Sequence, residues 1–275
     1  MPTTYTHYRF GKDVLASLPV PQRQAIEQCR ELYDIGLHGP DILFYYRPVV
    51  RTKVASQGSQ MHKETADLFF NRAARVIGKE KNPAAARAYL YGFICHFALD
   101  SECHPYVEKM IQASGITHAE IEMELDRMLM VEDGIDPLTH PLTNHIHPTK
   151  QNAVVIAPFF KGRTVGEIKE SLQFMIYCHR LFLAPGKKKR SFVFAGLKIA
   201  GMYEHLKGTL ISYEPNPDCA DFNRILKRQY DGAVPLAVSL IMDYQKTLFE
   251  QKELPERFHR TFGEGDDWEN LSLEI

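Results

Sequence analysis

The chain lacks the features that define several common classes of protein. Its 33 lysines and arginines are balanced by 34 aspartates and glutamates, for a net charge of −1, so a strongly basic nucleic-acid binder is disfavoured. It has no uninterrupted apolar run of roughly 20 residues, so no membrane-spanning helix is predicted. The residues up to Arg9 contain no basic stretch followed by an apolar one. No secretory signal is therefore evident, and a cytoplasmic location is expected.

Cysteine is scarce and shows no pairing pattern. The five cysteines are scattered over 275 residues, and none forms a CxxC motif. An odd number of scattered cysteines without a secretory signal indicates reduced thiols rather than a disulfide framework. Cys95 and Cys103 each neighbour a histidine in the sequence, which directs their side chains away from the histidine face of a helix. We predict that both pack in the core and bind no metal.

Alternating strand patterns and internal repeats are absent as well, whereas helical periodicity is frequent. Pro83 suits a first helical turn, and Thr117 with Glu120 suits a capping box. Apolar residues recur at helical spacing in seven ranges: 12–36 (broken by Pro19 and Pro21), 60–78, 83–113, 117–131, 164–184, 191–207 and 218–251 (interrupted near Gly232 and Pro235). We predict an all-α fold, with one multi-helix domain over residues 1–262 and an acidic tail over 263–275. Residues 36–60 and 133–163 are predicted to be irregular.

Potential metal ligands are concentrated between residues 96 and 122. They are His96, Asp100, His104, His118 and Glu122. His96, Asp100 and His104 follow one another at intervals of four residues, so they share one face of a helix. His96 and His104 lie about 12 Å apart along the axis, too far to bind one ion through bonds of about 2 Å. Asp100 lies midway and can bridge, so the pattern predicts a metal cluster.

A single HxxxD pair would be weak evidence, because most such pairs are surface contacts or core histidines. Here an HxxxD pair is extended by an in-phase histidine and followed by an HxxxE pair, which chance explains less easily. Sites with two metals roughly 3.5–4 Å apart suit the hydrolysis of phosphoesters. The pattern therefore favours a metal-dependent phosphoester hydrolase.

These motifs, together with the loop sequence GPDILF at residues 39–44, resemble the zinc-dependent phospholipase C family over roughly residues 5–250. That family includes secreted bacterial phosphatidylcholine-hydrolysing enzymes and the amino-terminal domain of glycosylphosphatidylinositol-specific phospholipase D. The spacing here looks closer to the phospholipase D domain. The chain is similar, more distantly, to single-strand-specific zinc nucleases that share the helical fold.

The resemblance implies a set of metal ligands by position. One ion would be held by Asp41, His62, His96 and Asp100, and a second by His104, His118 and Glu122. His7 would contribute to a third ion and share Asp100 with the first. That third site in the family also uses the terminal amine of the processed chain, whereas here Met1 and Pro2 precede His7 by several residues. Glu124 and Asp126 are alternatives to Glu122 that do not keep the HxxxE spacing.

The resemblance also implies a chemistry. Asp41 corresponds to the aspartate that acts as general base or bridging ligand, and two or three zinc ions would activate water. Manganese or iron would also suit mixed histidine and carboxylate ligands. The implied substrate is a phospholipid or another phosphodiester. The alternatives are an intracellular nuclease or nucleotide phosphodiesterase, with nucleic acid the less favoured substrate, and a non-catalytic metal-binding protein. A His-Asp-domain phosphohydrolase is disfavoured because no His-Asp dipeptide occurs.

Other histidines and one basic cluster are less informative. His140, His145 and His147 fall in the Pro-rich stretch and are expected in a solvated loop, whereas His179 is expected at a buried or boundary position. The sequence KKKR at 187–190 lies between apolar residues, as in proteins that contact a membrane surface. A basic loop between helices is the commoner explanation of such a cluster, so peripheral membrane contact stays an open alternative.

Overall fold

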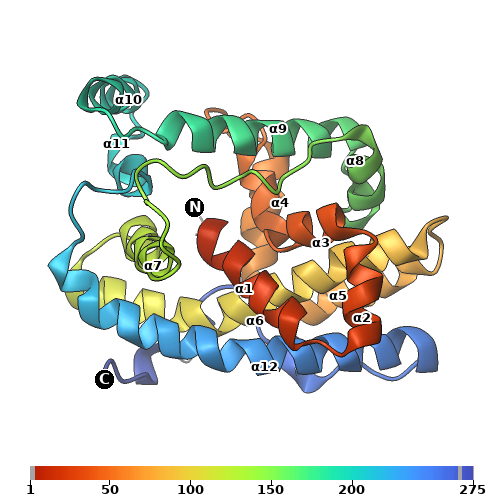
Figure 1. Ribbon diagram of the computed structural model, residues 1–275. Coiled ribbons are helices and arrows are strands. Elements are labelled where there is room, and N and C mark those ends of the chain that lie inside the picture. Colours follow the sequence, from red (N-terminus) through yellow and green to blue (C-terminus); the bar gives the residue numbers. More distant parts are fainter. Residues whose placement is uncertain (1–3, 266–267, 275) are drawn as a thin grey trace.

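The structure is a computed structural model that describes residues 4–265 and 268–274, and helices dominate it (Figure 1). Within these residues no strand occurs, and one isolated bridge joins Thr65 to Thr261. The α-helices are α1 (Thr4–Ser17), α2 (Val20–Glu27), α3 (Arg30–Gly36), α4 (Lys53–Lys63), α5 (Ala66–Ile77), α6 (Pro83–Ser114), α7 (His118–Glu132), α8 (Lys150–Ile156), α9 (Val165–Phe182), α10 (Lys187–Ile199), α11 (Tyr203–Leu206) and α12 (Ala220–Glu250). The predicted all-α class is confirmed.

Short 3-10 helices join several of these elements. They are η1 (Gly39–Tyr45), η2 (Ala157–Phe159), η3 (Lys207–Thr209), η4 (Pro217–Cys219), η5 (Glu256–His259) and η6 (Trp268–Asn270). In the part of the chain that the structure describes, no helix is long and apolar enough to cross a membrane. The division into a domain over 1–262 and a tail stays a prediction.

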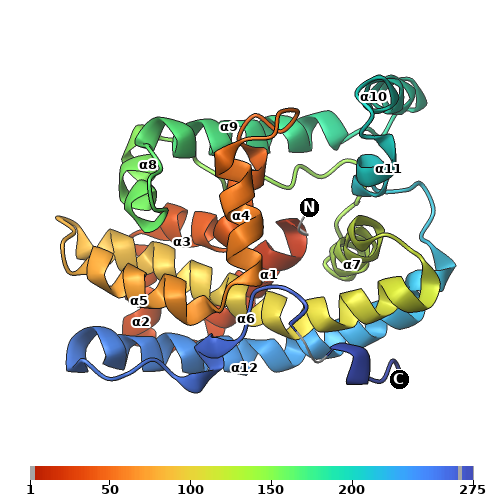
Figure 2. The ribbon, with the colours of Figure 1, turned by 180° about the vertical axis from the view of Figure 1, so that it is seen from behind.

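Helix α6 forms the centre of the molecule. Figure 1 shows α12 running antiparallel along one side of it, and Figure 2 shows α4 standing upright between α6 and α9. The middle of α6 is buried on every side because its neighbours cover all its faces. Phe93 stacks on Phe69 and Phe97 stacks on Phe258, so aromatic rings from three parts of the chain close the core around it. The buried His96 and Asp100 are therefore held on a rigid support.

The ends of α6 and the start of α7 match their sequence signals. The side chain of Asn82 accepts a hydrogen bond from the Ala85 N–H, and Pro83 follows it in the first turn. Thr117 caps α7 by accepting from the Glu120 N–H, as predicted. Glu120 does not complete a capping box, because its carboxylate accepts instead from the side chain of Asn216.

Several predicted boundaries were wrong. Helix α1 begins at Thr4 rather than near residue 12, and the range predicted as 60–78 is divided between α4 and α5. Helices α4 and α8 fall largely or wholly within the ranges predicted to be irregular. Side-chain caps from Thr52 and Thr149 start these two helices, although neither has a long apolar repeat. Tertiary packing therefore stabilises helices that local periodicity does not show.

Helix α12 continues through Gly232 and Pro235, so the predicted interruption was wrong. An interior proline removes one backbone hydrogen bond and favours a kink. Buried residues on both sides of Pro235, including Ala233, Ala237 and Ile241, keep one face of α12 in the core and offset that loss. The basic cluster at 187–190 forms the first turn of α10, so its prediction as a loop between helices was also wrong.

Candidate metal centre

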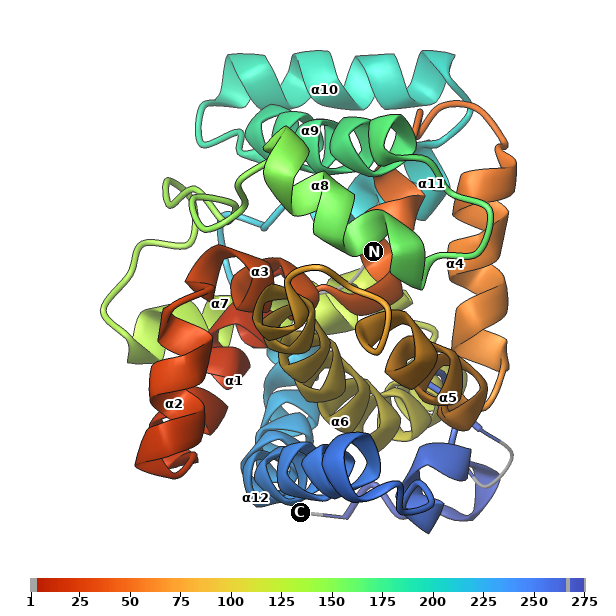
Figure 3. The same ribbon diagram turned by 90° about the vertical axis from the view of Figure 1, so that its right-hand side faces the viewer.

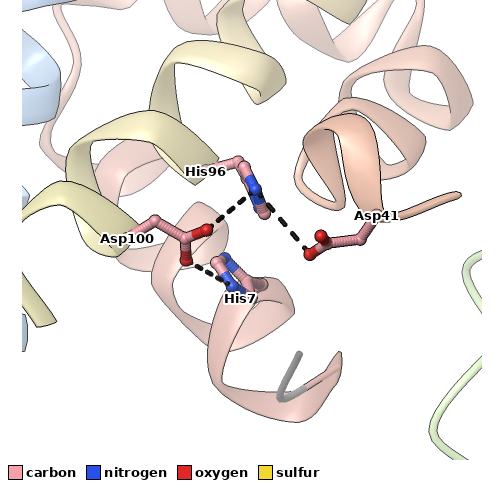
Figure 4. A group of neighbouring side chains, drawn as sticks. All are labelled: His7, Asp41, His96 and Asp100. Carbon is pink, nitrogen blue, oxygen red and sulfur yellow. Dashed lines mark ion pairs between the residues drawn. The ribbon is translucent and has the colours of Figure 1, made fainter. Parts of the chain in front are cut away.

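Four predicted ligands from three separate elements meet at the centre of the fold. His7 of α1, Asp41 of η1, and His96 and Asp100 of α6 each offer a ligand atom, and these atoms all lie within 4.8 Å of one another (Figure 4). His7 Nε2 lies 3.1 Å from Asp100 Oδ1, and His96 Nε2 lies 3.0 Å from Asp100 Oδ2. All four residues are buried. We refer to them as the first ligand group.

A second ligand group lies one helical turn further along α6. It consists of His104 of α6 with His118 and Glu122 of α7. Glu122 Oε1 lies 2.9 Å from His118 Nε2 and 3.4 Å from His104 Nε2. His118 is exposed, whereas the other two residues are buried, so this group opens toward solvent. The gap of fourteen positions between His104 and His118 consists of the last turns of α6 and the short connection 115–117 to α7.

His62 of α4 lies between the two groups. Its Nε2 is 3.1 Å from Asp41 Oδ1 and 3.9 Å from Asp100 Oδ2. The structure thus brings all eight predicted ligands into one neighbourhood. In the structure His7 clusters with Asp41, His96 and Asp100. The family resemblance implied His62 rather than His7 as the partner of those three residues. How the ligands divide among individual ions stays a prediction, and the terminal amine lies outside the described residues.

The donor set fits a cation because buried ligand atoms have no hydrogen-bond partner among the described residues. The buried ligand atoms without a hydrogen-bond partner are Asp41 Oδ2, Asp100 Oδ2, Glu122 Oε2 and His96 Nε2. Buried polar atoms in folded proteins are nearly always paired, so each unpaired one needs an explanation. Asp41 Oδ2 and Asp100 Oδ2 each face His96 Nε2 without a hydrogen bond, which is an arrangement that a bound metal ion would satisfy. Histidine and carboxylate ligands together suit zinc.

The electrostatics of the cluster keep Asp100 and Glu122 ionised, because neighbouring histidines lower the pKa of both carboxyl groups. Burial by itself would raise the pKa of Asp100, but the charges of His104, His96 and His7 lower it well below its usual range. Burial opposes a charge on His104 too, yet Asp100 and Glu122 raise its pKa to about 10. Without a metal, the cluster therefore holds protons on histidine opposite ionised carboxylates. A metal ion must displace those protons, so metal binding at neutral pH releases them.

Asp126 positions the helix that carries His7. Its carboxylate accepts hydrogen bonds from the Tyr5 N–H at 3.2 Å, the Thr6 N–H at 2.8 Å and the Thr6 hydroxyl at 2.6 Å. A carboxylate at a helix N-terminus satisfies free N–H groups and complements the helix dipole. Because Asp126 is engaged in this way, Glu122 stays the candidate ligand of the two. Glu124 is also engaged elsewhere, with the Asn216 N–H.

The C-terminal segment, residues 255–263, holds two of the histidines, and sequence reasoning did not identify it. His104 Nδ1 donates to the backbone carbonyl of Phe262 at 2.6 Å, which leaves Nε2 free to face Glu122. The Gly263 N–H donates to the backbone carbonyl of His62, and His62 Nδ1 donates to the Gly58 carbonyl at 2.8 Å. Such second partners fix the orientation of a ligating imidazole. No short motif marks this role, because the partner is a backbone carbonyl.

Replacing Phe262 with alanine should weaken zinc binding by about 10–100-fold, the usual effect of losing support behind a metal ligand. The Phe262 ring lies 6.1 Å from the rings of both His62 and His96, so its loss releases the segment from the cluster. Phe258→Ala is the matched control, because this equally buried ring packs on Phe70 and Phe97 instead. Each variant should lose about 3–5 kcal/mol of stability. Equal zinc affinities in the two variants, measured by competition with a chelating dye, would contradict the assigned role.

A further set of histidines is buried beside the cluster and is neutral. His38 Nε2 lies 2.8 Å from His145 Nε2, and His145 stacks on Tyr8. Burial lowers the pKa of His145 to about 3 and that of His179 to about 4. The prediction that His145 lies in a solvated loop was wrong, because this loop returns to cover α1. The buried or boundary position predicted for His179 is confirmed, since the residue is half-buried. The packing role predicted for Cys95 and Cys103 is confirmed as well.

Both ligand groups open on a cleft of about 640 Å³. Asp41, His62, His104, His118 and Glu122 line it. Its other walls are formed by apolar side chains, one cation and two acids: Phe44, Pro48, Met202, Leu206, Lys63, Glu108 and Glu264. The cleft is large enough for a small organic molecule and joins a polar floor to apolar walls.

The fold and the site together define a helical protein in which two neighbouring groups of side chains able to hold metal ions lie beside a cleft. The family model of zinc dependent phospholipase C matches residues 6–171, which is more than half of the chain. The chain belongs to this family, and the predicted resemblance is confirmed. Comparison with curated proteins and with solved structures gives no match.

Proposed function

We propose that this protein is a phospholipase C-like phosphodiester hydrolase that acts through a cluster of two or three zinc ions. The observation that carries the proposal is the cleft, whose floor bears the second ligand group together with His62 and Asp41 and whose walls include apolar side chains. A phosphoester with an apolar substituent fits this combination, since the phosphate would meet the metals and the acyl chains would meet Phe44, Met202 and Leu206. Family membership supports the same chemistry.

His7, Asp41, His62, His96, Asp100, His104, His118 and Glu122 would hold the ions. Bound zinc would polarise the phosphoryl oxygens and bring the pKa of coordinated water toward neutral. Asp41 is the candidate general base. Its Oδ1 lies 3.1 Å from His62 Nε2, and the residue reaches the cleft, so its carboxylate can orient a water molecule and accept its proton. His62 would then hold that carboxylate in place through its own bond to Gly58.

The cleft supports a lipid substrate over a nucleic acid. Single-stranded nucleic acids are bound largely by stacking of bases on aromatic side chains. Of the tyrosines that made a nuclease conceivable, Tyr45, Tyr89 and Tyr91 are buried, and neither Tyr46 nor Tyr106 lines the cleft. Phe44 is the one aromatic ring among the described residues of the cleft wall outside the ligands. Nucleotide phosphodiester hydrolysis therefore has less structural support.

The test is turnover by the zinc-loaded full chain on phosphatidylcholine vesicles, a soluble phosphorylcholine ester and single-stranded DNA. We expect diacylglycerol and phosphorylcholine from the vesicles, because cleavage falls on the diacylglycerol side of phosphate. Asp41→Asn should lower the rate by about a hundredfold or more. Cleavage of the DNA alone would make the protein a nuclease. Bound zinc without turnover on any of the three would identify a non-catalytic metal protein.

A further inference from the structure

Helix α10 carries an unusual apolar stripe on its outer face. Ile199 is 89% exposed and Phe192 is 77% exposed, more than any other large hydrophobic side chain in the described part of the chain. They lie seven residues apart, two helical turns, so both point to the same side, with the exposed Ala195 between them. Figures 1 and 3 show α10 at the periphery of the molecule, beyond α9.

The opposite face of α10 anchors it to the body of the protein. Val193 is buried and packs with Ala184 and Leu210, and Leu197 lies against the same small cluster. Lys189 Nζ donates to the carbonyls of Arg180 and Leu183 at 2.7 and 2.6 Å. The orientation of the helix is thus set by its inner face. The outer stripe is exposed because the inner face of α10 is the one that packs on the protein.

The charge of α10 is of one sign. Residues 187–199 contain five cations and no acidic residue, and three of the lysines occupy the first turn. Cations at a helix N-terminus oppose the helix dipole, so the stability of α10 itself does not explain them. Among the described residues, no ion pair involves Lys187, Lys188 or Lys198. These lysines are exposed, so they can attract a ligand of negative charge.

We propose that α10 docks on the surface of an anionic phospholipid bilayer. Helices that lie in a membrane interface combine exposed apolar side chains with flanking lysines in this way. The lysines would attract the anionic head groups, and Phe192 and Ile199 would enter the layer beneath them. This inference rests on the proposed function, because a phospholipid substrate is what gives bilayer contact its use.

The position of α10 links such docking to the cleft. Met202 and Leu206, which line the cleft, lie three and seven residues beyond Ile199, and α11 follows α10 after a short turn. The residues that form one apolar wall of the cleft therefore follow the proposed docking helix directly in the sequence. Other partners fit less well. Interface cores between proteins are depleted of lysine, and a second copy would bring five cations against five.

The test is co-sedimentation of the zinc-loaded full chain with vesicles of phosphatidylcholine, with and without phosphatidylserine. We expect binding to the anionic vesicles that falls at high salt. Binding to the anionic vesicles should fall at least about tenfold in Phe192→Ser/Ile199→Ser. In Lys187→Gln/Lys188→Gln it should fall by a similar factor, but only at low salt, because salt screens the charges of the lysines. The matched controls are Phe249→Ser/Val131→Ser, which removes side chains exposed by 66% and 61% on other helices, and Lys79→Gln/Lys81→Gln. Both control variants should bind as the unsubstituted protein does.

Turnover of the soluble phosphorylcholine ester separates this proposal from the proposed function. The α10 variants should hydrolyse it normally, since none of the substituted residues lines the cleft. Normal hydrolysis with no vesicle binding, or with equal loss in the control variants, would overturn the docking proposal alone. A molecular mass that halves in Phe192→Ser/Ile199→Ser would also overturn it, because the stripe would then cover a second copy of the chain.

Discussion

Asp100→Asn should lose most of the bound zinc and at least about a hundredfold of turnover. Asp100 belongs to the first ligand group and lies next to the second, since its oxygens are 3.1 Å from His7 Nε2, 3.0 Å from His96 Nε2 and 3.7 Å from His104 Nδ1. Asparagine keeps the shape of the side chain, but it removes the negative charge that the cations require. Its amide hydrogens would also face histidine nitrogens that must bind metal.

Zinc content per chain, measured by emission spectroscopy after purification without chelator, decides this prediction. Asp34→Asn is the matched control, because Asp34 is a buried carboxylate that pairs with Arg30 at 2.7 Å and lies outside both ligand groups. The control should keep its zinc even if it loses stability. An Asp100→Asn protein with the same two or three ions as the unsubstituted chain would contradict the predicted cluster.

Gly39→Ala should both destabilise the fold and disrupt the first ligand group. Gly39 has a φ of +46°, a left-handed conformation that costs other residues about 1–2 kcal/mol. A Cβ at this position would overlap the imidazole of His96. Displacing a packed side chain costs about 1–3 kcal/mol more. We therefore expect a loss of about 2–5 kcal/mol in the free energy of unfolding and a clear loss of zinc affinity.

Gly115→Ala separates backbone strain from the effect on His96. Gly115 also has a positive φ, +73°, where it ends α6, and a Cβ there would meet nothing within 4 Å. Chemical denaturation should show a loss of about 1–2 kcal/mol for this variant, with no change in a zinc titration. If zinc affinity fell equally in both variants, the close approach of Gly39 to His96 would have no role in metal binding.

Helix α6 and its ligands were predictable because the information is local. Pro83 suits the first turn of α6, and the four-residue spacing aligns His96, Asp100 and His104 on one face of the helix. That face would be the same in any fold that kept the helix. The HxxxE pair of α7 is local in the same sense, and Thr117 caps that helix as expected.

Helices without a strong repeat were not predictable in this way. Helix α4 carries His62, yet its sequence looked irregular, and a Thr52 cap with packing against η1 makes it helical. Helix α12 continues past Pro235 because the core covers one of its faces. His145 is buried only because its loop returns over Tyr8 and His38. In each case contacts from elsewhere in the chain outweigh local preference.

The residue types and spacings of the chain by themselves were enough to predict its helical class and the side chains of its candidate metal centre. Periodicity within one helix is a short-range property, so it can be read from neighbouring residues. The family resemblance implied that His7 shares Asp100, but the tertiary structure alone decided that Asp126 anchors the helix that carries His7. It also decided that the Phe262 carbonyl, 158 residues away, orients His104. Such contacts depend on how whole helices pack, and no spacing in the sequence records them.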